Sequence, residues 1–194
     1  MKKFKIIWIL FILGSGILTA QNKYERAYRI RKSQFPAKAF NYISEKIEGT
    51  RRIRFYEETD SAKTSFEATF KKDRLWYSIE FDKDGVMQVI GILIKPIEIP
   101  DDSFAKIETY LGNHFSKYRV RRLQQQYRIT GEVAQATTIK NAFQNLMLPD
   151  MVYELFVKGK KDGTRADFEI TFDAEGNLMN IRKALPANYD RILY

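Results

Sequence analysis

The sequence predicts an α+β protein built from two tandem repeats, each with a helix packed on one face of a four-stranded antiparallel sheet. The main observation is that Tyr77–Met87 recurs 91 residues later as Phe168–Leu178. Both segments alternate apolar and polar residues, turn at Asp-x-x-Gly and continue as a second strand, which is the pattern of a hairpin. A segment of helical periodicity that opens with a proline, Pro36 or Pro100, precedes each hairpin. Internal repetition of this kind indicates an architecture more strongly than any single motif does.

The first 20 residues have the features of a signal peptide. Three lysines precede the apolar run Ile6–Leu13, and the small residue Ala20 suits cleavage before Gln21. A membrane-spanning helix needs about 20 apolar residues, and neither this segment nor any later one reaches that length. We therefore expect export to the periplasm or the exterior, no transmembrane segment after cleavage, and a basic, solvated N-terminal arm over residues 21–34.

Residues 35–97 form the first expected repeat. Apolar residues at helical spacing, from Ala37 to Ile47, predict a helix that ends at Gly49. Alternating patterns then predict strands over 52–57, 66–71 and 75–81, and the last strand enters the hairpin. Because such alternation is typical of a sheet that is buried on one side, the other side should face away from the helix.

Residues 98–194 form the second expected repeat, which is the longer one. Asp101 or Asp102 can cap its helix, and strands are expected over 118–126, 151–158, 166–172 and 178–183. The two helix starts lie 64 residues apart, whereas the two hairpins lie 91 residues apart. The second repeat should therefore contain an insertion, and its periodicity predicts an extra helix near 131–147. Whether the two sheets join edge to edge is left open by the sequence.

The segment Ile79-Glu80-Phe81-Asp82-Lys83-Asp84-Gly85, together with the proline-opened helices, resembles the PepSY-like domains of bacterial envelope proteins. Those domains are grouped with the β-lactamase-inhibitor-protein-like fold. The resemblance covers residues 34–184 as two tandem copies and implies a small exported protein. The best-known member of that fold binds an enzyme through the open face of its sheet, but no inhibitory motif transfers to this chain. The whole chain is also similar to uncharacterised exported proteins of flavobacteria, mainly over 66–81, 124–127 and 185–194.

The composition restricts the partners. The chain has a net charge of +9, and removal of the three leader lysines leaves +6, which favours acidic partners through long-range attraction. The absence of cysteine excludes disulfides, thiol chemistry and lipid acylation. We expect a protein or peptide of the cell envelope rather than nucleic acid, because no nucleic-acid-binding motif is present. Nothing in the sequence indicates an oligomeric state.

No catalytic residue, cofactor or metal site is expected. His114 is the only histidine, and we interpret it as a residue that caps the end of a helix. The acids Glu80, Asp82 and Asp84 resemble the start of a calcium loop, but Gly91 stands where that loop needs a carboxylate. There is no phosphate-binding glycine loop and no nucleophile elbow. A hydrolase with paired carboxylates is the remaining enzyme hypothesis.

The candidate binding site is the sheet face opposite the helices. If Ile53 and Phe55 face the first helix, the period of two places arginine and aromatic residues on the other face. These candidate residues are Arg52, Arg54, Tyr56, Trp76, Arg119 and Arg121. The leading hypothesis is an exported, non-catalytic binding protein that recognises a protein or peptide through this face. The alternatives are an electrostatic binder of anionic lipid or polysaccharide, and a face that is merely solvated or covered by the inserted helix.

Overall fold

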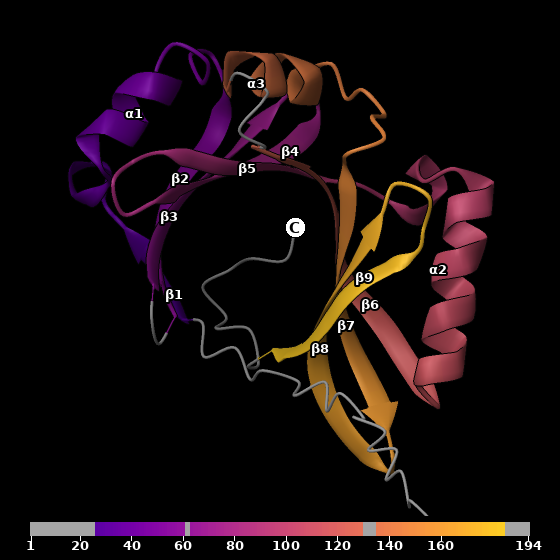
Figure 1. Ribbon diagram of the computed structural model, residues 1–194. Coiled ribbons are helices and arrows are strands. Elements are labelled where there is room, and N and C mark those ends of the chain that lie inside the picture. Colours follow the sequence, from indigo (N-terminus) through magenta and orange to yellow (C-terminus); the bar gives the residue numbers. More distant parts are fainter. Residues whose placement is uncertain (1–25, 61–62, 130–134, 185–194) are drawn as a thin grey trace, which may run out of the picture.

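The computed structural model describes residues 26–60, 63–129 and 135–184. Within them, nine antiparallel strands form one sheet in which the spatial order is the chain order (Figure 1). The strands are β1 (Arg26–Ile30), β2 (Arg51–Asp60), β3 (Lys63–Lys72), β4 (Leu75–Asp82), β5 (Met87–Leu93), β6 (Lys117–Arg128), β7 (Val152–Lys161), β8 (Thr164–Asp173) and β9 (Leu178–Ala184). The helices are α1 (Ala37–Ile43), α2 (Asp101–His114) and α3 (Gln135–Phe143), with 3-10 turns at Lys32–Gln34 and Pro96–Glu98.

The sheet is continuous through its middle, so the expected division into two helix-plus-four-stranded repeats is wrong. Strand β5 pairs with β6 over five residues, from Val89 opposite Arg128 to Leu93 opposite Gln124. An unpaired strand edge exposes a row of N–H and C=O groups, and this pairing satisfies two such edges at once. Strand β1 adds to the edge of β2, so residues 26–30 of the expected solvated arm belong to the sheet.

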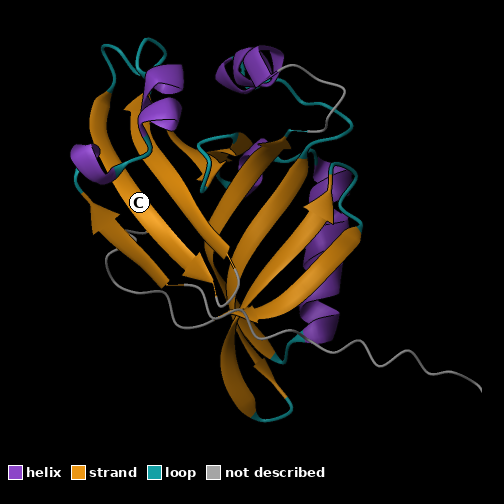
Figure 2. Cartoon of the chain, turned by 60° about the vertical axis from the view of Figure 1, so that its left-hand side comes forward, coloured by secondary structure: helices purple, strands orange, loops and turns teal. Residues whose placement is uncertain are grey.

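The three helices lie on the convex side of the curved sheet, and the described helices leave the concave side uncovered (Figure 1). Figure 2 shows the same strands as one twisted sheet from a second direction. The apolar core fills the space between helices and sheet: the rings of Phe35 and Phe55 lie 4.7 Å apart under α1, and those of Phe115 and Phe168 lie 4.8 Å apart under α2. Helix α3 packs on this side too, because Phe143 lies 5.2 Å from the ring of Tyr77.

A group of buried polar side chains lies on the convex side of β6 and β7. Tyr127 and Tyr153 are 3% and 0% exposed, and Gln125 is the register partner of Tyr153. The Tyr127 hydroxyl donates a hydrogen bond of 2.7 Å to the Leu146 carbonyl and accepts one from the Gln125 amide. The Tyr153 hydroxyl has no hydrogen-bond partner among the described residues. We call Gln125, Tyr127 and Tyr153 the tyrosine cluster.

The β8–β9 hairpin turn holds α2 against the sheet. In the β8–β9 turn, the Asp173 carboxylate accepts hydrogen bonds from the amides of Glu175 and Asn177, at 3.0 and 2.8 Å. Gly176 then adopts a φ of +83°, and its Cα lies so close to the Ser103 carbonyl of α2 that a Cβ would overlap it. The Ser103 hydroxyl donates to the Ala174 carbonyl at 2.9 Å. Glycine is therefore required here for both conformation and space.

Candidate functional site

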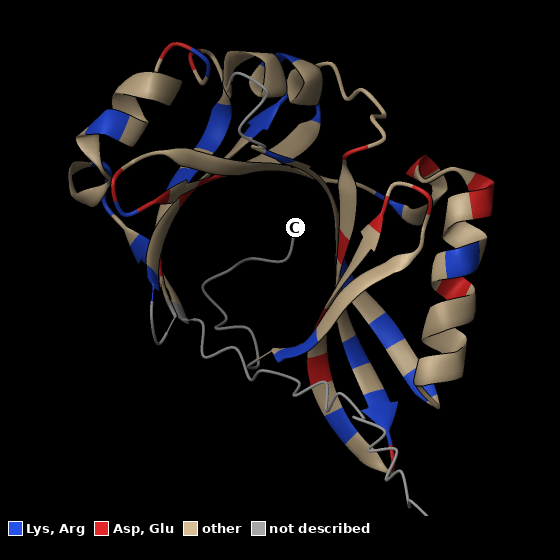
Figure 3. Ribbon diagram, viewed as in Figure 1, with Lys and Arg blue, Asp and Glu red and all other residues tan. Residues whose placement is uncertain are grey.

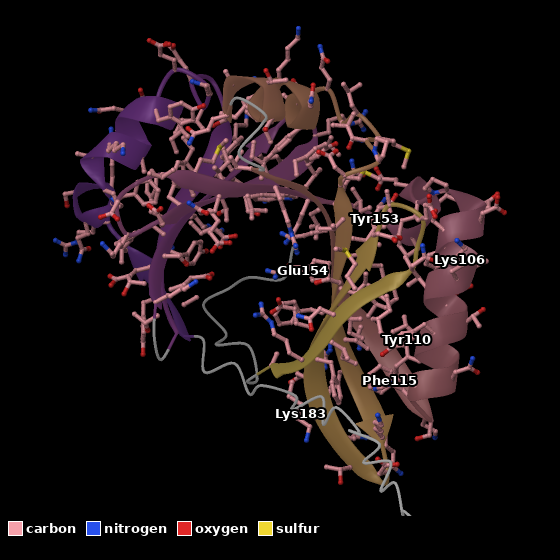
Figure 4. All side chains as sticks on the ribbon, in the orientation of Figure 1. Lys106, Tyr110, Phe115, Tyr153, Glu154 and Lys183 are labelled. Carbon is pink, nitrogen blue, oxygen red and sulfur yellow. The ribbon has the colours of Figure 1, made fainter. Side chains whose placement is uncertain are left out.

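The concave side of the sheet carries a groove of about 1170 Å³. Its lining comes from strands β2 to β9 and is almost entirely polar, which makes it unlike the convex side. The lining includes Glu58, Glu67, Ser78, Glu80, Arg122, Gln124, Gln126, Arg128, Glu154, Glu169, Thr171, Asn180 and Arg182. In Figure 4, Glu154 projects toward the concave side, while Tyr110 and Phe115 lie toward the convex one. We call this feature the groove.

Alternation along each strand produces the groove. On β4, Ile79 and Phe81 are fully buried in the core, so the intervening Glu80 projects into the groove. Register then sets residues from neighbouring strands side by side: Glu80 lies opposite Glu67, and Gln124 lies opposite Glu154. The groove is therefore a continuous layer of hydrogen-bonding side chains rather than a pocket enclosed by loops.

Ion pairs organise the β6–β9 part of the groove. The Arg122 guanidinium lies 3.5 Å from the Glu154 carboxylate and 4.5 Å from the centre of the Phe156 ring. Arg182 on β9 pairs with Glu169 on β8, whose exposed fraction is 5%. A buried carboxylate is costly unless it is paired or hydrogen-bonded, and the arginine supplies that compensation. These pairs hold their side chains in fixed positions along the wall of the groove.

The charge of the groove differs from the charge of the chain. Seven acidic and five basic side chains line it: Glu58, Glu67, Glu80, Asp82, Asp84, Glu154 and Glu169 against Lys63, Lys83, Arg122, Arg128 and Arg182. The chain as a whole carries +9. The positive charge therefore lies mostly outside the groove, and the groove itself presents both signs to a ligand.

Four of the six predicted site residues lie together on β2–β4. Arg54 and Tyr56 project from the same face of β2 as Glu58, and Tyr56 is the register partner of Glu67. The guanidinium of Arg52 lies 5.7 Å from the centre of the Trp76 ring. Arg52 itself has a φ of +59° at a register shift in β2, so it reaches Trp76 from a bulge rather than from regular alternation.

Arg119 and Arg121 lie apart from those four residues, on the far part of β6. The register shifts between Val120 and Arg122, and Arg121 is the extra residue of this bulge. The bulge changes which residues face the groove: Val120 pairs with the core residue Val157, and Arg122 pairs with Phe156. Sequence reasoning missed Arg122 because strict alternation places it on the same side as Val120.

The acids of the β4–β5 turn and the histidine at the end of α2 form no metal site among the described residues. The Asp82 carboxylate accepts hydrogen bonds from the amides of Asp84 and Val86, at 3.0 and 2.9 Å, as a turn requires. Among the described residues, no group of three His, Asp or Glu side chains is arranged to hold a metal ion. His114 lies at the end of α2, where burial, assisted by the nearby Lys161, lowers its pKa.

Comparison with known proteins finds similar folds among solved structures. No family model matches the chain, and no match is found among curated proteins. Among solved structures, a DUF2874 family protein of Bacteroides ovatus is similar at a TM-score of 0.50 and 8% identity, covering 76% of this chain and 86% of that chain. A protein of Bacteroides eggerthii, described provisionally as periplasmic, is similar at 0.49 and 13%, covering 76% and 88%.

At these identities the first structure shows a likeness of fold alone. Neither carries the PepSY-like name, so that resemblance stays a prediction. No helix in the described ranges is long and apolar enough to cross a membrane. The expected signal peptide, residues 1–20, lies outside the described residues.

Proposed function

We propose that this chain is an exported, non-catalytic binding protein of the cell envelope that holds an extended segment of a protein or peptide in its groove. The observation that carries the proposal is the groove itself, on the sheet face that the described helices leave uncovered. Its volume of about 1170 Å³ exceeds the roughly 300–1,000 Å³ typical of pockets for small molecules. A polymer that runs across several strands fits such a shape better than a compact substrate does.

The lining of the groove matches an extended polypeptide. Each peptide unit offers one N–H donor and one C=O acceptor, and the groove presents amides and carboxylates that can meet both. Gln124 and Gln126 supply donors and acceptors on β6, and Thr171 and Asn180 do so on β8 and β9. The two signs of charge would select a segment that carries both, while the net positive charge attracts acidic proteins from a distance.

Two further observations support the other parts of the proposal. Export is supported by the leader-like residues 1–20 and agrees with the periplasmic description of a similar fold. The absence of catalysis is supported by the carboxylates of Glu154 and Glu169, each of which pairs with an arginine. A hydrolase built on Glu154 and Glu169 would need one of these two carboxyl groups to give and take a proton, which those pairs oppose.

A display experiment tests the proposal. The chain from residue 21 on is immobilised and a random peptide library is selected against it, then the enriched peptides are measured against two variants. Ser78→Tyr places a bulky ring on the floor of the groove, whereas Thr109→Tyr places the same ring on the exposed surface of α2. We expect enriched peptides to lose at least tenfold in affinity with Ser78→Tyr and none with Thr109→Tyr. Failure to enrich peptides, or equal loss with both variants, would refute the proposal.

A further inference from the structure

A block of basic side chains lies on the concave face of the sheet, where β6 begins and where β7 and β8 meet at their turn, just beyond the residues that line the groove. Register places Lys117 opposite Lys160, and Lys160 opposite Arg165. The next row along the strands has Arg119 opposite Lys158, and Lys158 opposite Asp167. Because the residues of both rows are two positions apart on each strand, all six project from the same face of the sheet. We call the five cations, Lys117, Arg119, Lys158, Lys160 and Arg165, the basic block.

The basic block is a repulsive arrangement within the folded chain. Like charges directly opposite each other on neighbouring strands destabilise a sheet. Asp167 is the single carboxylate of the two rows, and no salt bridge joins any of the five cations to a carboxylate within the described part of the chain. Four of the five side chains are exposed and Lys160 is partly exposed. Nothing in the packing therefore accounts for these positive charges, but an external anion would.

The shape of the block indicates the kind of anion. Neighbouring strands are about 5 Å apart and successive rows about 7 Å apart, so five charges are spread over the face of three neighbouring strands. The surface hollow that these residues line holds only about 200 Å³ and shares no residue with the groove. Figure 3 shows the basic residues gathered at this end of β6–β8, beyond the end of α2. An open array of charges at a projecting hairpin can meet a surface of mobile phosphate groups, whereas a single folded ligand needs a cavity.

We propose that the basic block binds the anionic phosphate groups of a lipid membrane surface and so places the groove next to that surface. Each lysine or arginine near an anionic membrane contributes about 1 kcal/mol, which is about fivefold in affinity. Three charges removed together should then weaken binding by about 100-fold.

Sedimentation with lipid vesicles tests this proposal with the chain from residue 21 on. Vesicles of neutral phosphatidylcholine are compared with vesicles containing 30% phosphatidylglycerol, at about 50 and 300 mM salt. The test variant is Lys117→Gln with Lys160→Gln and Arg165→Gln. The control is Lys38→Gln with Lys95→Gln and Lys140→Gln, which removes the same charge from exposed positions elsewhere. Circular dichroism confirms that both variants are folded.

We expect binding to the anionic vesicles only, weakened by salt, reduced about 100-fold in the test variant and less than about fivefold in the control. Equal losses in both variants would show that net charge, not the block, is responsible, and would overturn the proposal. So would absence of binding to anionic vesicles, including the case in which the chain binds soluble heparin instead. Peptide capture by the groove does not depend on these residues, so the two proposals fail separately.

Discussion

The two tyrosines of the tyrosine cluster should respond in opposite ways to the loss of a hydroxyl group. Tyr153 is fully buried, and its hydroxyl has no hydrogen-bond partner among the described residues. Tyr127 is nearly as buried, but its hydroxyl donates to the Leu146 carbonyl at 2.7 Å. The changes Tyr153→Phe and Tyr127→Phe thus remove the same atom from neighbouring sites that differ in hydrogen bonding.

The magnitudes follow from these contacts. A buried polar group without a partner costs about 1–3 kcal/mol, so Tyr153→Phe should raise the free energy of unfolding by about 1–2 kcal/mol, allowing for the small space left behind. Tyr127→Phe should lower it by about 1–3 kcal/mol, because the Leu146 carbonyl and the Gln125 amide each lose a partner. In a chain of this length, 1 kcal/mol corresponds to a Tm change of about 2–4 °C.

Urea unfolding followed by tryptophan fluorescence and by circular dichroism measures both effects. The slope of the transition should be unchanged in both variants, since neither alters the surface exposed on unfolding. A Tyr153→Phe variant that is destabilised by more than about 1 kcal/mol would refute the reasoning, because it would show that the hydroxyl makes a favourable interaction.

Three further predictions concern a turn, the pH and the predicted site. Gly176→Ala should lower the free energy of unfolding by about 3 kcal/mol or more, because the new Cβ would overlap the Ser103 carbonyl. Gly163 has a φ of +79° but open space around it, so Gly163→Ala should cost only about 1–2 kcal/mol. Equal losses of the two variants in thermal unfolding would contradict this prediction. Burial raises the pKa of Tyr127 and Tyr153 from about 10 in the unfolded chain to about 12 in the folded one. Between these values the folded chain binds more protons, so the free energy of unfolding should fall as pH rises above 10. A free energy of unfolding that stays constant from pH 8 to 11.5 in urea titrations would contradict this. Arg54 and Trp76 lie on the same face as the groove, next to its lining on β2 and β4. Arg54→Ala with Trp76→Ala should reduce binding of groove-selected peptides about tenfold, and unchanged binding would show that these two residues are not part of the binding site.

The strands that the sequence predicted best are those whose apolar residues alternate without interruption. The expected strand 75–81 corresponds to β4, Leu75–Asp82, and the expected 166–172 lies within β8, Thr164–Asp173. The prediction of which side chains face the groove was wrong where the alternation is broken. One extra residue at Arg121 turns Arg122 toward the groove, and a bulge of one residue leaves no mark in the sequence that distinguishes it from a continuous strand.

The groove residues were missed for a different reason. Sequence reasoning selected arginine and aromatic side chains, as is appropriate for hot spots, and so passed over carboxylates such as Glu67 and Glu154. Their importance comes from register, which sets Glu67 opposite both Tyr56 and Glu80. Register across four or five strands depends on how the chain pairs at long range, and the order of residues along one strand does not contain it.

The pairing of β5 with β6 has a consequence for folding. The strands from β1 to β9 form one continuous series of hydrogen-bonded pairs. Cutting the chain between β5 and β6 would therefore leave two unpaired strand edges at once. Neither fragment keeps a complete hydrophobic layer, since Ile92 on β5 and Leu123 on β6 belong to the same core. The polypeptide should therefore melt as one cooperative body, and half of it expressed alone should aggregate rather than fold.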